Sequence, residues 1–288
     1  MRRHLTVLRT GPQTLVQDLG RPGYAHLGVP PSGALDTPAL RLANRLAGNP
    51  ESAACLEVLL GGLAVRAESS CTVVVTGPRV PVRRNGCAVG SHAPVHLAHG
   101  DVLELGTPEQ GLRSYLAASG GFAVTAELGS RSTDLLSGIG PAPVQPGDTL
   151  PLGRITAPAT GADVLTPTHV PAELVIPVLL GPRDEWFTTP ATQLRSGSWT
   201  VSEKSNRVGM RLHGTALTRA EAFQGQELPS EGIPTGGVQV PADGQPVVFL
   251  ADHPTTGGYP VIGVVPEEAL PLLAQARPGV RLEFRPQD

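Results

Sequence analysis

The sequence predicts a mainly β protein made of many short strands and a few short helices. Glycine and proline account for 35 and 30 of the 288 residues, and both residues interrupt regular structure. Hydrophobic residues make up 40% of the chain, which is enough for a sizeable buried core. Short apolar runs that end in glycine or proline recur along the sequence, as is typical of strands joined by turns. A β-rich fold is therefore favoured over a helical bundle.

Two segments carry the signals of a helix. The first helix is expected to run from about Thr37 to Leu46, with Asp36 or Thr37 as its cap and with Gly48 and Pro50 ending it. The second begins at Pro266–Glu268, where two glutamates lie at the positive end of the helix dipole, and ends before Pro278. Most of the remaining chain is predicted to form strands.

Similar sequence patterns in distant predicted strands indicate two similar β-units. An apolar run ending in Gly-Pro-Arg occurs twice, and a turn of the type Gly-Asp leading into a strand also occurs twice, with a weaker third copy near the end. These segments are 73–79 with 177–183, and 100–106 with 147–153 and 279–284. A small, proline-containing connector within 157–171 fits a boundary, so we place the domains at 1–165 and 166–288 and expect them to pack together.

Charge and motifs exclude several classes of function. The net charge is −3 and no basic run exceeds two residues, which disfavours nucleic-acid binding. Lys204 is the only lysine, and neither a phosphate-binding Gly-Lys loop nor a biotin-accepting Met-Lys-Met tract is present. ATP is therefore expected on a partner protein or shared with one, and covalent biotin is not expected here. The three cysteines form no Cys-x-x-Cys, and neither a signal peptide nor a membrane span is apparent, so we expect a cytoplasmic protein.

The densest polar segment follows an apolar strand near residue 250. Asp252 or the adjacent His253 can move a proton, and Tyr259 can orient a ligand or donate a proton. The residues between them are Thr255, Thr256, Gly257 and Gly258, which allow a ligand to approach the backbone closely. The alternative is a glycine-rich hairpin without chemistry.

Three further segments carry candidate binding groups. Gln239 lies on a strand between apolar residues and is either a reader of an amide or carboxylate or a solvent-facing side chain. The run Gly129–Asp134 places hydroxyls around Arg131, which suits carboxylate or phosphate recognition, although Ser132 or Thr133 can instead cap a helix. Near the N-terminus, a glycine- and proline-shaped loop carries Asp18 and His26.

Metal and cysteine chemistry are less favoured. His92, His96 and His99 with Asp101 are interrupted by Pro94 and Gly100, so surface histidines are expected rather than a metal site. No cysteine lies in a polar, electropositive segment, and no Gly-x-Ser-x-Gly elbow occurs.

Taken together, six segments resemble the KipA family, the family of the 5-oxoprolinase C subunit, which is also described as biotin-dependent carboxyltransferase or allophanate hydrolase subunit 2. They cover nearly the whole chain in order and are Asp18–Tyr24, 28–36, 43–49, Gly129–Asp134, Arg207–Leu212 and Asp252–Tyr259. One departure is Gly77–Arg79, where the family is expected to have Gly-Ala-Asp. Proline removes a backbone donor there, which puts that loop's ligand contacts in doubt.

The resemblance implies two cyclophilin-like β-barrel domains packed together, with a site in a groove between them. It also implies an ATP-dependent complex with a KipI-like B subunit and the A subunit of 5-oxoprolinase, active only when assembled, that opens 5-oxo-L-proline to L-glutamate. Two alternatives remain: an antagonist that binds a KipI-like kinase inhibitor, and the carboxyltransferase component of a urea carboxylase or allophanate hydrolase system.

An antagonist that only binds a KipI-like inhibitor needs no polar site, whereas an enzyme needs one. For an enzyme we expect Arg131 or Arg207 to bind the substrate carboxylate and Gln239 to read its amide. Proton transfer is expected from Asp252 and Tyr259, with His26 as a further acid or base. Asp18, Ser132, Thr255, Thr256, Gly257 and Gly258 complete the expected substrate-binding set.

Overall fold

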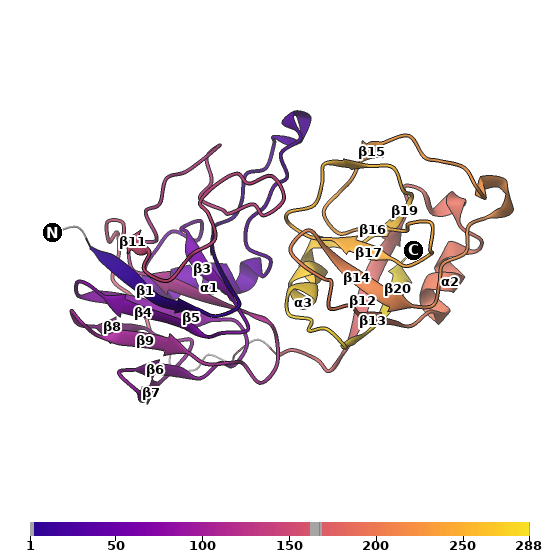
Figure 1. Ribbon diagram of the computed structural model, residues 1–288. Coiled ribbons are helices and arrows are strands. Elements are labelled where there is room, and N and C mark those ends of the chain that lie inside the picture. The colour runs from indigo at the N-terminus through magenta and orange to yellow at the C-terminus, as the bar shows by residue number, and fades with distance from the viewer. Residues whose placement is uncertain (1–2, 162–166, 168, 288) are drawn as a thin grey trace. The chain divides into compact units, whose positions relative to one another are not determined.

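The computed structural model describes residues 3–161, 167 and 169–287, which divide into two compact units (Figure 1). The first unit comprises Met1–Arg21, Ser32–Asp134 and Gly138–Val170, and the second comprises Pro22–Pro31, Leu135–Ser137 and Pro171–Asp288. Two short segments that interrupt the first unit in sequence, Pro22–Pro31 and Leu135–Ser137, thus belong to the second unit. The expected boundary between residues 165 and 166 lies outside the described residues.

The first unit contains two antiparallel sheets. Its six-stranded sheet has the order β11 (Thr149–Pro151), β1 (His4–Thr10), β4 (Leu63–Ala67), β9 (Val102–Leu105), β6 (Val82–Arg84) and β7 (Cys87–Val89). Its five-stranded sheet has the order β2 (Gln13–Gln17), β3 (Cys55–Leu59), β10 (Arg113–Ala118), β5 (Cys71–Thr76) and β8 (Val95–Leu97).

The five-stranded sheet is buried on both faces. Along β3, Leu56 and Val58 join the large apolar core shared with the six-stranded sheet. The alternate residue Cys55 joins a second cluster, in which Tyr115 and Ala117 of β10 pack with apolar residues of helix α1 (Thr37–Ala47). Because successive side chains of a strand point to opposite faces, this alternation produces three layers: sheet, sheet and helix.

Helix α1 forms where the sequence predicts it. The Oδ1 atom of Asp36 accepts a hydrogen bond from the N–H of Ala39 at 3.0 Å, and Gly48 ends the helix with φ of 72°. That left-handed conformation carries little steric cost for glycine. Leu40, Ala43 and Ala47 form the buried face.

The second unit is built around a closed barrel of seven strands. Their order is β12 (Glu173–Leu180), β19 (Val261–Val264), β16 (Gly237–Gln239), β17 (Val247–Phe249), β14 (Gly209–Gly214), β13 (Trp199–Val201) and β20 (Arg281–Gln287). A separate two-stranded sheet pairs β15 (Glu231–Gly232) with β18 (Thr256–Gly257). Leu174, Ile176 and Val178 alternate into the barrel core, where Trp199 lies 5.1 Å from Phe284, ring centre to ring centre.

Short helices make up the remaining regular structure. They are η1 (Ala25–Leu27), η2 (Asp184–Trp186), α2 (Pro190–Ser196), η3 (Glu221–Phe223), η4 (Glu267–Ala269) and α3 (Leu270–Ala274). The second expected helix is therefore divided between η4 and α3. Pro271 lies in the first turn of α3 and has no N–H to continue an α-helical ladder from the preceding turn, so that turn is a 3₁₀ helix.

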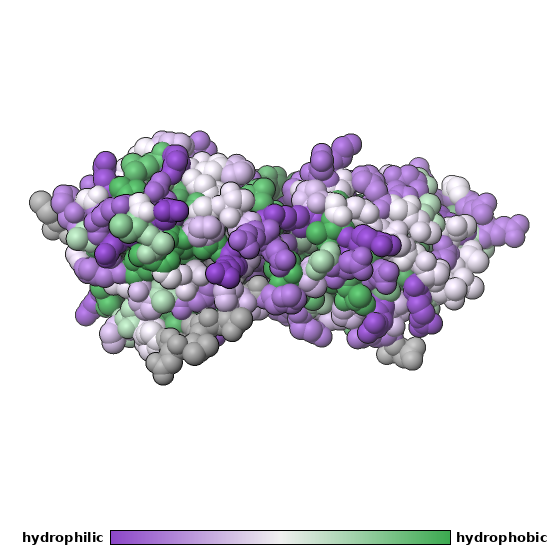
Figure 2. Space-filling model, turned by 90° about the horizontal axis from the view of Figure 1, so that it is seen from below, coloured by the Kyte–Doolittle hydropathy of each residue, from purple (hydrophilic) through white to green (hydrophobic). Residues whose placement is uncertain are grey.

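The mainly β fold class is confirmed. Of the two repeated sequence patterns, one occurs in both units and the other recurs within the first unit. β5 and β12, which are each followed by Gly-Pro-Arg, lie in different units. β9 and β11, which follow the Gly-Asp turns, lie in the same unit, so this pair does not relate one unit to the other. On the face drawn in Figure 2, hydrophilic residues cover much of both units, and the hydrophobic ones gather mainly on the first unit, at the left.

Candidate functional site

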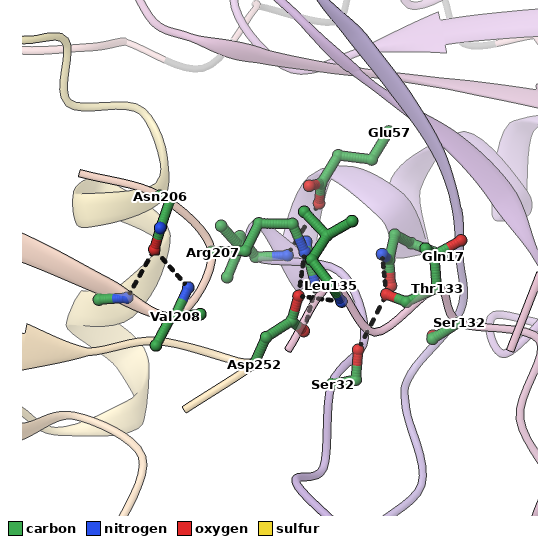
Figure 3. Close-up of polar contacts among 12 residues, drawn as sticks. Gln17, Ser32, Glu57, Ser132, Thr133, Leu135, Asn206, Arg207, Val208 and Asp252 are labelled. Atoms are coloured by element: carbon green, nitrogen blue, oxygen red, sulfur yellow. Dashed lines mark hydrogen bonds and ion pairs between the residues drawn. The ribbon is translucent and has the colours of Figure 1, made fainter. Parts of the chain in front are cut away.

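A buried ion pair joins Arg207 to Asp252 in the second unit (Figure 3). The strands β14 and β17 are antiparallel neighbours with Gly209 opposite Phe249, so the residues just before β14 lie beside those just after β17. The backbone continues this pairing, because the N–H of Asp252 donates to the carbonyl of Arg207 at 3.1 Å. Register alone therefore brings together two residues that are 45 positions apart.

The side chains of this pair meet at two points. Nε of Arg207 donates to Oδ2 of Asp252 at 2.8 Å, and Nη2 donates to Oδ1 at 2.9 Å. Only 1% of the Arg207 side chain and 0% of the Asp252 side chain are exposed. The N–H of Leu135, from the segment Leu135–Ser137, also donates to Oδ2 at 3.3 Å. Asp252 therefore holds both Arg207 and the loop at Leu135 in place. The sequence predicted separate roles, proton transfer for Asp252 and carboxylate binding for Arg207, whereas these contacts are structural.

The ring of His253, next to the ion pair, is buried and makes a hydrogen bond at each of its two nitrogens. Its Nδ1 lies 2.8 Å from the carbonyl oxygen of Pro254, which can only accept, so Nδ1 carries the proton. Nε2 then accepts from the hydroxyl of Thr235 at 2.9 Å. Burial lowers the pKa of His253 below its ordinary value of 6.5.

The glycine-rich loop is attached to the barrel through Gln239. This side chain is only 7% exposed, so the solvent-facing alternative is wrong, and its Nε2 donates to the carbonyl of Tyr259 at 3.1 Å. Gly257 makes that approach possible. A Cβ atom there would lie 2.9 Å from Nε2 of Gln239 and 2.6 Å from Cδ1 of Ile233. Gln239 and Tyr259 are thus brought together, but through the backbone of Tyr259 rather than its ring.

The same loop borders an open cavity of about 910 Å³ in the second unit. Gly258 and Tyr259 form one wall, and Tyr259 is 47% exposed. Arg219, which sequence reasoning did not select, lies on the wall as well. Its guanidinium carbon is 5.6 Å from the centre of the Trp186 ring, and its Nη1 donates to the carbonyl of Gln226 at 3.0 Å. A cation on the wall of such a cavity is suited to a small anionic ligand.

The hydroxyl-rich segment of the first unit closes around Asp18. Oδ1 of Asp18 accepts from the hydroxyls of Ser130 at 2.6 Å and Ser132 at 2.7 Å, and from the N–H of Gly20 at 2.8 Å. Oδ2 accepts from the N–H of Arg131 at 2.6 Å. This carboxylate therefore anchors two loops to each other. The alternative of a helix cap at Ser132 or Thr133 is wrong, because no helix follows these residues.

The other predicted residues have different surroundings. Nε of Arg131, in the first unit, donates to the carbonyl of Val124 at 2.8 Å. His26 is exposed on η1, where Nδ1 lies 3.2 Å from the carbonyl oxygen of Gly23. Thr256 is exposed, whereas Thr255 is half-buried. The roles assigned to all these residues stay predictions.

Two buried polar groups of the first unit escaped sequence reasoning. Glu57 lies opposite Tyr115 across β3 and β10, and its Oε2 accepts from the Tyr115 hydroxyl at 2.7 Å. Burial, followed by the charge of Glu57, raises the pKa of Tyr115 well above its ordinary value. Arg21, which lies in the loop after Asp18, is not among the predicted site residues and is only 1% exposed. The sequence signal that could have revealed the Glu57–Tyr115 pair is a single glutamate within an apolar strand.

The histidine-rich region differs from the expectation at one position. His92 is buried rather than on the surface, with 4% exposure, while His96 and His99 are exposed. Over residues 3–161, 167 and 169–287, no group of three or more histidine, cysteine, aspartate or glutamate residues is placed to hold a metal ion. The helices in that same part of the chain are all too short or too polar to cross a membrane.

Comparison with known families decides the relationship of this chain. A model of the carboxyltransferase domain, subdomains A and B, matches residues 27–286. The chain belongs to this carboxyltransferase domain family. The resemblance noted in the sequence is thereby confirmed.

Among relatives in the carboxyltransferase domain family, the C subunit of Escherichia coli 5-oxoprolinase is 39% identical over 287 residues, covering 97% of this chain and 90% of the relative. The urea amidolyase of Saccharomyces cerevisiae is 31% identical, covering 96% of this chain but 16% of that much longer protein. The crystal structure of the Kluyveromyces lactis urea amidolyase superposes with a TM-score of 0.90 at 30% identity, over 100% of this chain and 19% of that one. The chain is thus homologous to the 5-oxoprolinase C subunit along nearly its whole length.

Proposed function

We propose that this chain is the C subunit of an ATP-dependent 5-oxoprolinase that opens 5-oxo-L-proline to L-glutamate together with a KipI-like B subunit and an A subunit. The observation that carries the proposal is the 39% identity to the E. coli 5-oxoprolinase C subunit, which extends over 97% of this chain and 90% of that protein. Such coverage leaves little of either chain outside the shared region.

The chemistry explains why ATP is required. A lactam carbonyl is a poor electrophile because the nitrogen lone pair is delocalised into it. Transfer of the γ-phosphoryl group to the lactam oxygen releases ADP and activates the carbon. Water then adds to that carbon, the C–N bond breaks as the nitrogen takes up a proton, and a second water releases phosphate. Since this chain has no phosphate-binding Gly-Lys loop, we place ATP on a partner protein or on a shared surface.

The cavity of the second unit is the proposed place for the substrate. Its volume of about 910 Å³ is ample for a five-membered ring with a carboxylate. Arg219 on its wall would bind the carboxylate, because Nε and Nη2 of Arg207 already face Asp252. Tyr259, exposed on the same wall, would donate the proton to the leaving nitrogen.

The remaining candidates then have supporting roles in this unit. Gln239 fixes the backbone of Tyr259, and the Arg207–Asp252 pair fixes the chain that leads into the loop. We therefore treat Gln239, Arg207 and Asp252 as positioning residues. Arg131 remains a second candidate for binding a carboxylate.

Variants of the reconstituted three-protein complex test these assignments. Tyr259→Phe is expected to lower kcat by about 10²-fold or more, as is typical of losing a general acid. Arg219→Gln is expected chiefly to raise KM for 5-oxoproline. Arg285→Ala, an exposed arginine on β20, is the control and should leave both constants unchanged. Wild-type rates in both Tyr259→Phe and Arg219→Gln would remove the cavity from the mechanism.

A second candidate function is carboxyl transfer in a urea carboxylase system. The observation favouring it is the 0.90 TM-score against the K. lactis urea amidolyase over the full length of this chain. It predicts turnover that depends on urea and on a biotinylated carrier protein. Turnover that needs 5-oxoproline and no biotin favours the main proposal. A protein that only binds a KipI-like partner would support neither turnover.

A further inference from the structure

Unpartnered buried polar atoms concentrate in one place in the first unit. Seven side-chain nitrogen or oxygen atoms among the described residues are buried without a hydrogen-bond partner, and four of the seven belong to three residues of this region. They are Oε1 of Gln17, Nε and Nη1 of Arg21, and Oγ1 of Thr133. Buried polar atoms are nearly always paired, so a cluster of exceptions indicates a missing partner.

Burial without a partner is most unfavourable for Arg21, because it is the charged member of this cluster. Its side chain is 1% exposed, and no carboxylate lies within ion-pair distance of it among the described residues. Nη2 donates to the carbonyl of Ser132, but the N–H of Nε and both N–H groups of Nη1 have no acceptor. Burying an unpaired charge is strongly unfavourable, and an anion is the partner that would offset it.

The three residues are held together by one peptide segment. Ser132 and Thr133 are consecutive, and Arg21 bonds to the carbonyl of Ser132 while Nε2 of Gln17 donates to the carbonyl of Thr133 at 2.8 Å. The N–H of Thr133 in turn donates to the carbonyl of Val16 at 2.9 Å. Figure 3 shows Gln17 and Ser32 directed at Thr133. These bonds leave Oε1 of Gln17 and Oγ1 of Thr133 without a protein partner.

The backbone around the cluster is also closely fitted. Gly140 has φ of +88°, and a Cβ there would lie 2.1 Å from the carbonyl oxygen of Ser132 and 3.1 Å from Nη2 of Arg21. Only glycine is accommodated at this point without a shift of the main chain. The guanidinium of Arg21 therefore lies close to the backbone of Gly140.

We propose that Arg21, Gln17 and Thr133 form a binding site for a small planar oxyanion of the carboxylate or bicarbonate type that also carries one N–H or O–H group. Arg21 supplies three N–H donors to the anion, and a planar guanidinium suits a planar O–C–O group. Oε1 of Gln17 can only accept, which calls for a donor on the ligand. The Thr133 hydroxyl can either donate to the anion or accept from the N–H or O–H group of the ligand. Bicarbonate and 5-oxo-L-proline both satisfy this description, whereas acetate has the anion without the donor.

The site lies wholly within the first unit and does not require the cavity of the second unit or the proposed activity. Its test is therefore binding to the full chain without partner proteins. Calorimetric titrations with sodium bicarbonate, 5-oxo-L-proline, acetate and phosphate distinguish the two sources and the shape requirement. We expect binding of bicarbonate or 5-oxoproline, weaker binding of acetate, and the weakest binding of tetrahedral phosphate.

Thr133→Val is the decisive variant, because Oγ1 of Thr133 has no protein partner to lose. Its melting temperature without ligand should equal or exceed that of the wild type, and its anion affinity should fall about tenfold. Arg21→Lys keeps the charge but loses the planar donors, and should bind about tenfold more weakly or worse. Arg154→Ala, an exposed arginine of the same unit, is the control and should bind normally.

Two results would overturn the proposal. One is the absence of binding by every anion tested. The other is a crystal structure grown in bicarbonate or 5-oxoproline in which these four atoms contact ordered water only. Binding that survives unchanged in both Thr133→Val and Arg21→Lys would place the anion elsewhere and would also contradict it. Loss of turnover with intact anion binding would instead concern the proposed function alone.

Discussion

Arg207 and Asp252 form a two-point ion pair, Nε to Oδ2 at 2.8 Å and Nη2 to Oδ1 at 2.9 Å, with both side chains almost fully buried. The pair links the segment just before β14 to the segment just after β17. Removing one partner leaves the other charged group buried, whereas replacing both does not.

The first prediction follows from this asymmetry. Asp252→Ala should lower the free energy of unfolding of the second unit by about 3–5 kcal/mol, because Arg207 loses its two-point contact with Asp252 in a buried setting. Urea unfolding followed by tryptophan fluorescence measures it, since Trp186 and Trp199 both lie in this unit. The double variant Arg207→Met with Asp252→Ala should recover part of the loss.

An exposed ion pair on the same barrel provides the control. Arg281 and Glu173 are 3.6 Å apart with exposures of 62% and 64%, so Glu173→Ala should cost about 0–1 kcal/mol. If Asp252→Ala is no more destabilising than Glu173→Ala, the buried pair does not hold the barrel as described.

The second prediction concerns the contact of Gly257 with Gln239. Gly257→Ala adds a methyl group at 2.6 Å from Cδ1 of Ile233 and 2.9 Å from Nε2 of Gln239, so the unfolding free energy should fall by about 1–3 kcal/mol. Gly232→Ala, across the same two-stranded sheet, meets no atom within 4 Å and should change stability by about 0.5 kcal/mol or less. Equal effects of the two substitutions would contradict this packing.

The third prediction concerns pH. Because the pKa of His253 is lowered in the folded protein, the unfolded chain binds a proton more readily than the folded chain below the ordinary value of 6.5. The stability that the neutral ring contributes is therefore complete above about pH 6.5 and is lost as the pH falls below it. Thermal unfolding between pH 5 and 8 should show a weaker pH dependence in His253→Asn than in the wild type.

His92 acts in the same direction, since burial lowers its pKa too, so His253→Asn removes only part of the effect. The matched control is His99→Asn, which replaces an exposed histidine and should leave the pH profile as it is in the wild type. A profile that steepens in His253→Asn would mean that the ring is charged in the folded state.

The fourth prediction concerns the phenol of Tyr115. Its pKa is raised by burial and by Glu57, so the Tyr115 phenol should stay protonated at alkaline pH values at which an ordinary tyrosine ionises. Difference absorbance of tyrosinate measures this, and Tyr115→Phe should remove the late-ionising group. Three tyrosines that titrate together in the folded protein would show that Tyr115 is not enclosed with Glu57.

Local signals explain which parts of the fold could be predicted from the sequence. Asp36 and Gly48 define the ends of α1 because capping and left-handed glycine act over a few residues. The mainly β class follows equally from short apolar runs and turns. Pro271 shows the limit of this reasoning, since the expected helix is divided at that residue.

Contacts between distant segments explain what the sequence could not show. Asp252 and Arg207 were both selected, but not as partners, because only the register of β14 and β17 pairs them. Arg219 and Arg21 look like ordinary arginines in sequence. Their places, on a cavity wall and in a cluster of buried polar atoms, depend on tertiary packing.

The most direct test of the proposed function is an omission experiment with the purified components of the complex. ATP hydrolysis and glutamate release from 5-oxo-L-proline are measured for this chain with both partner proteins, and for the two partners without it. The account predicts that both products form in a one-to-one ratio only when this chain is present. Equal glutamate release without it would contradict the proposed role as a component of the enzyme.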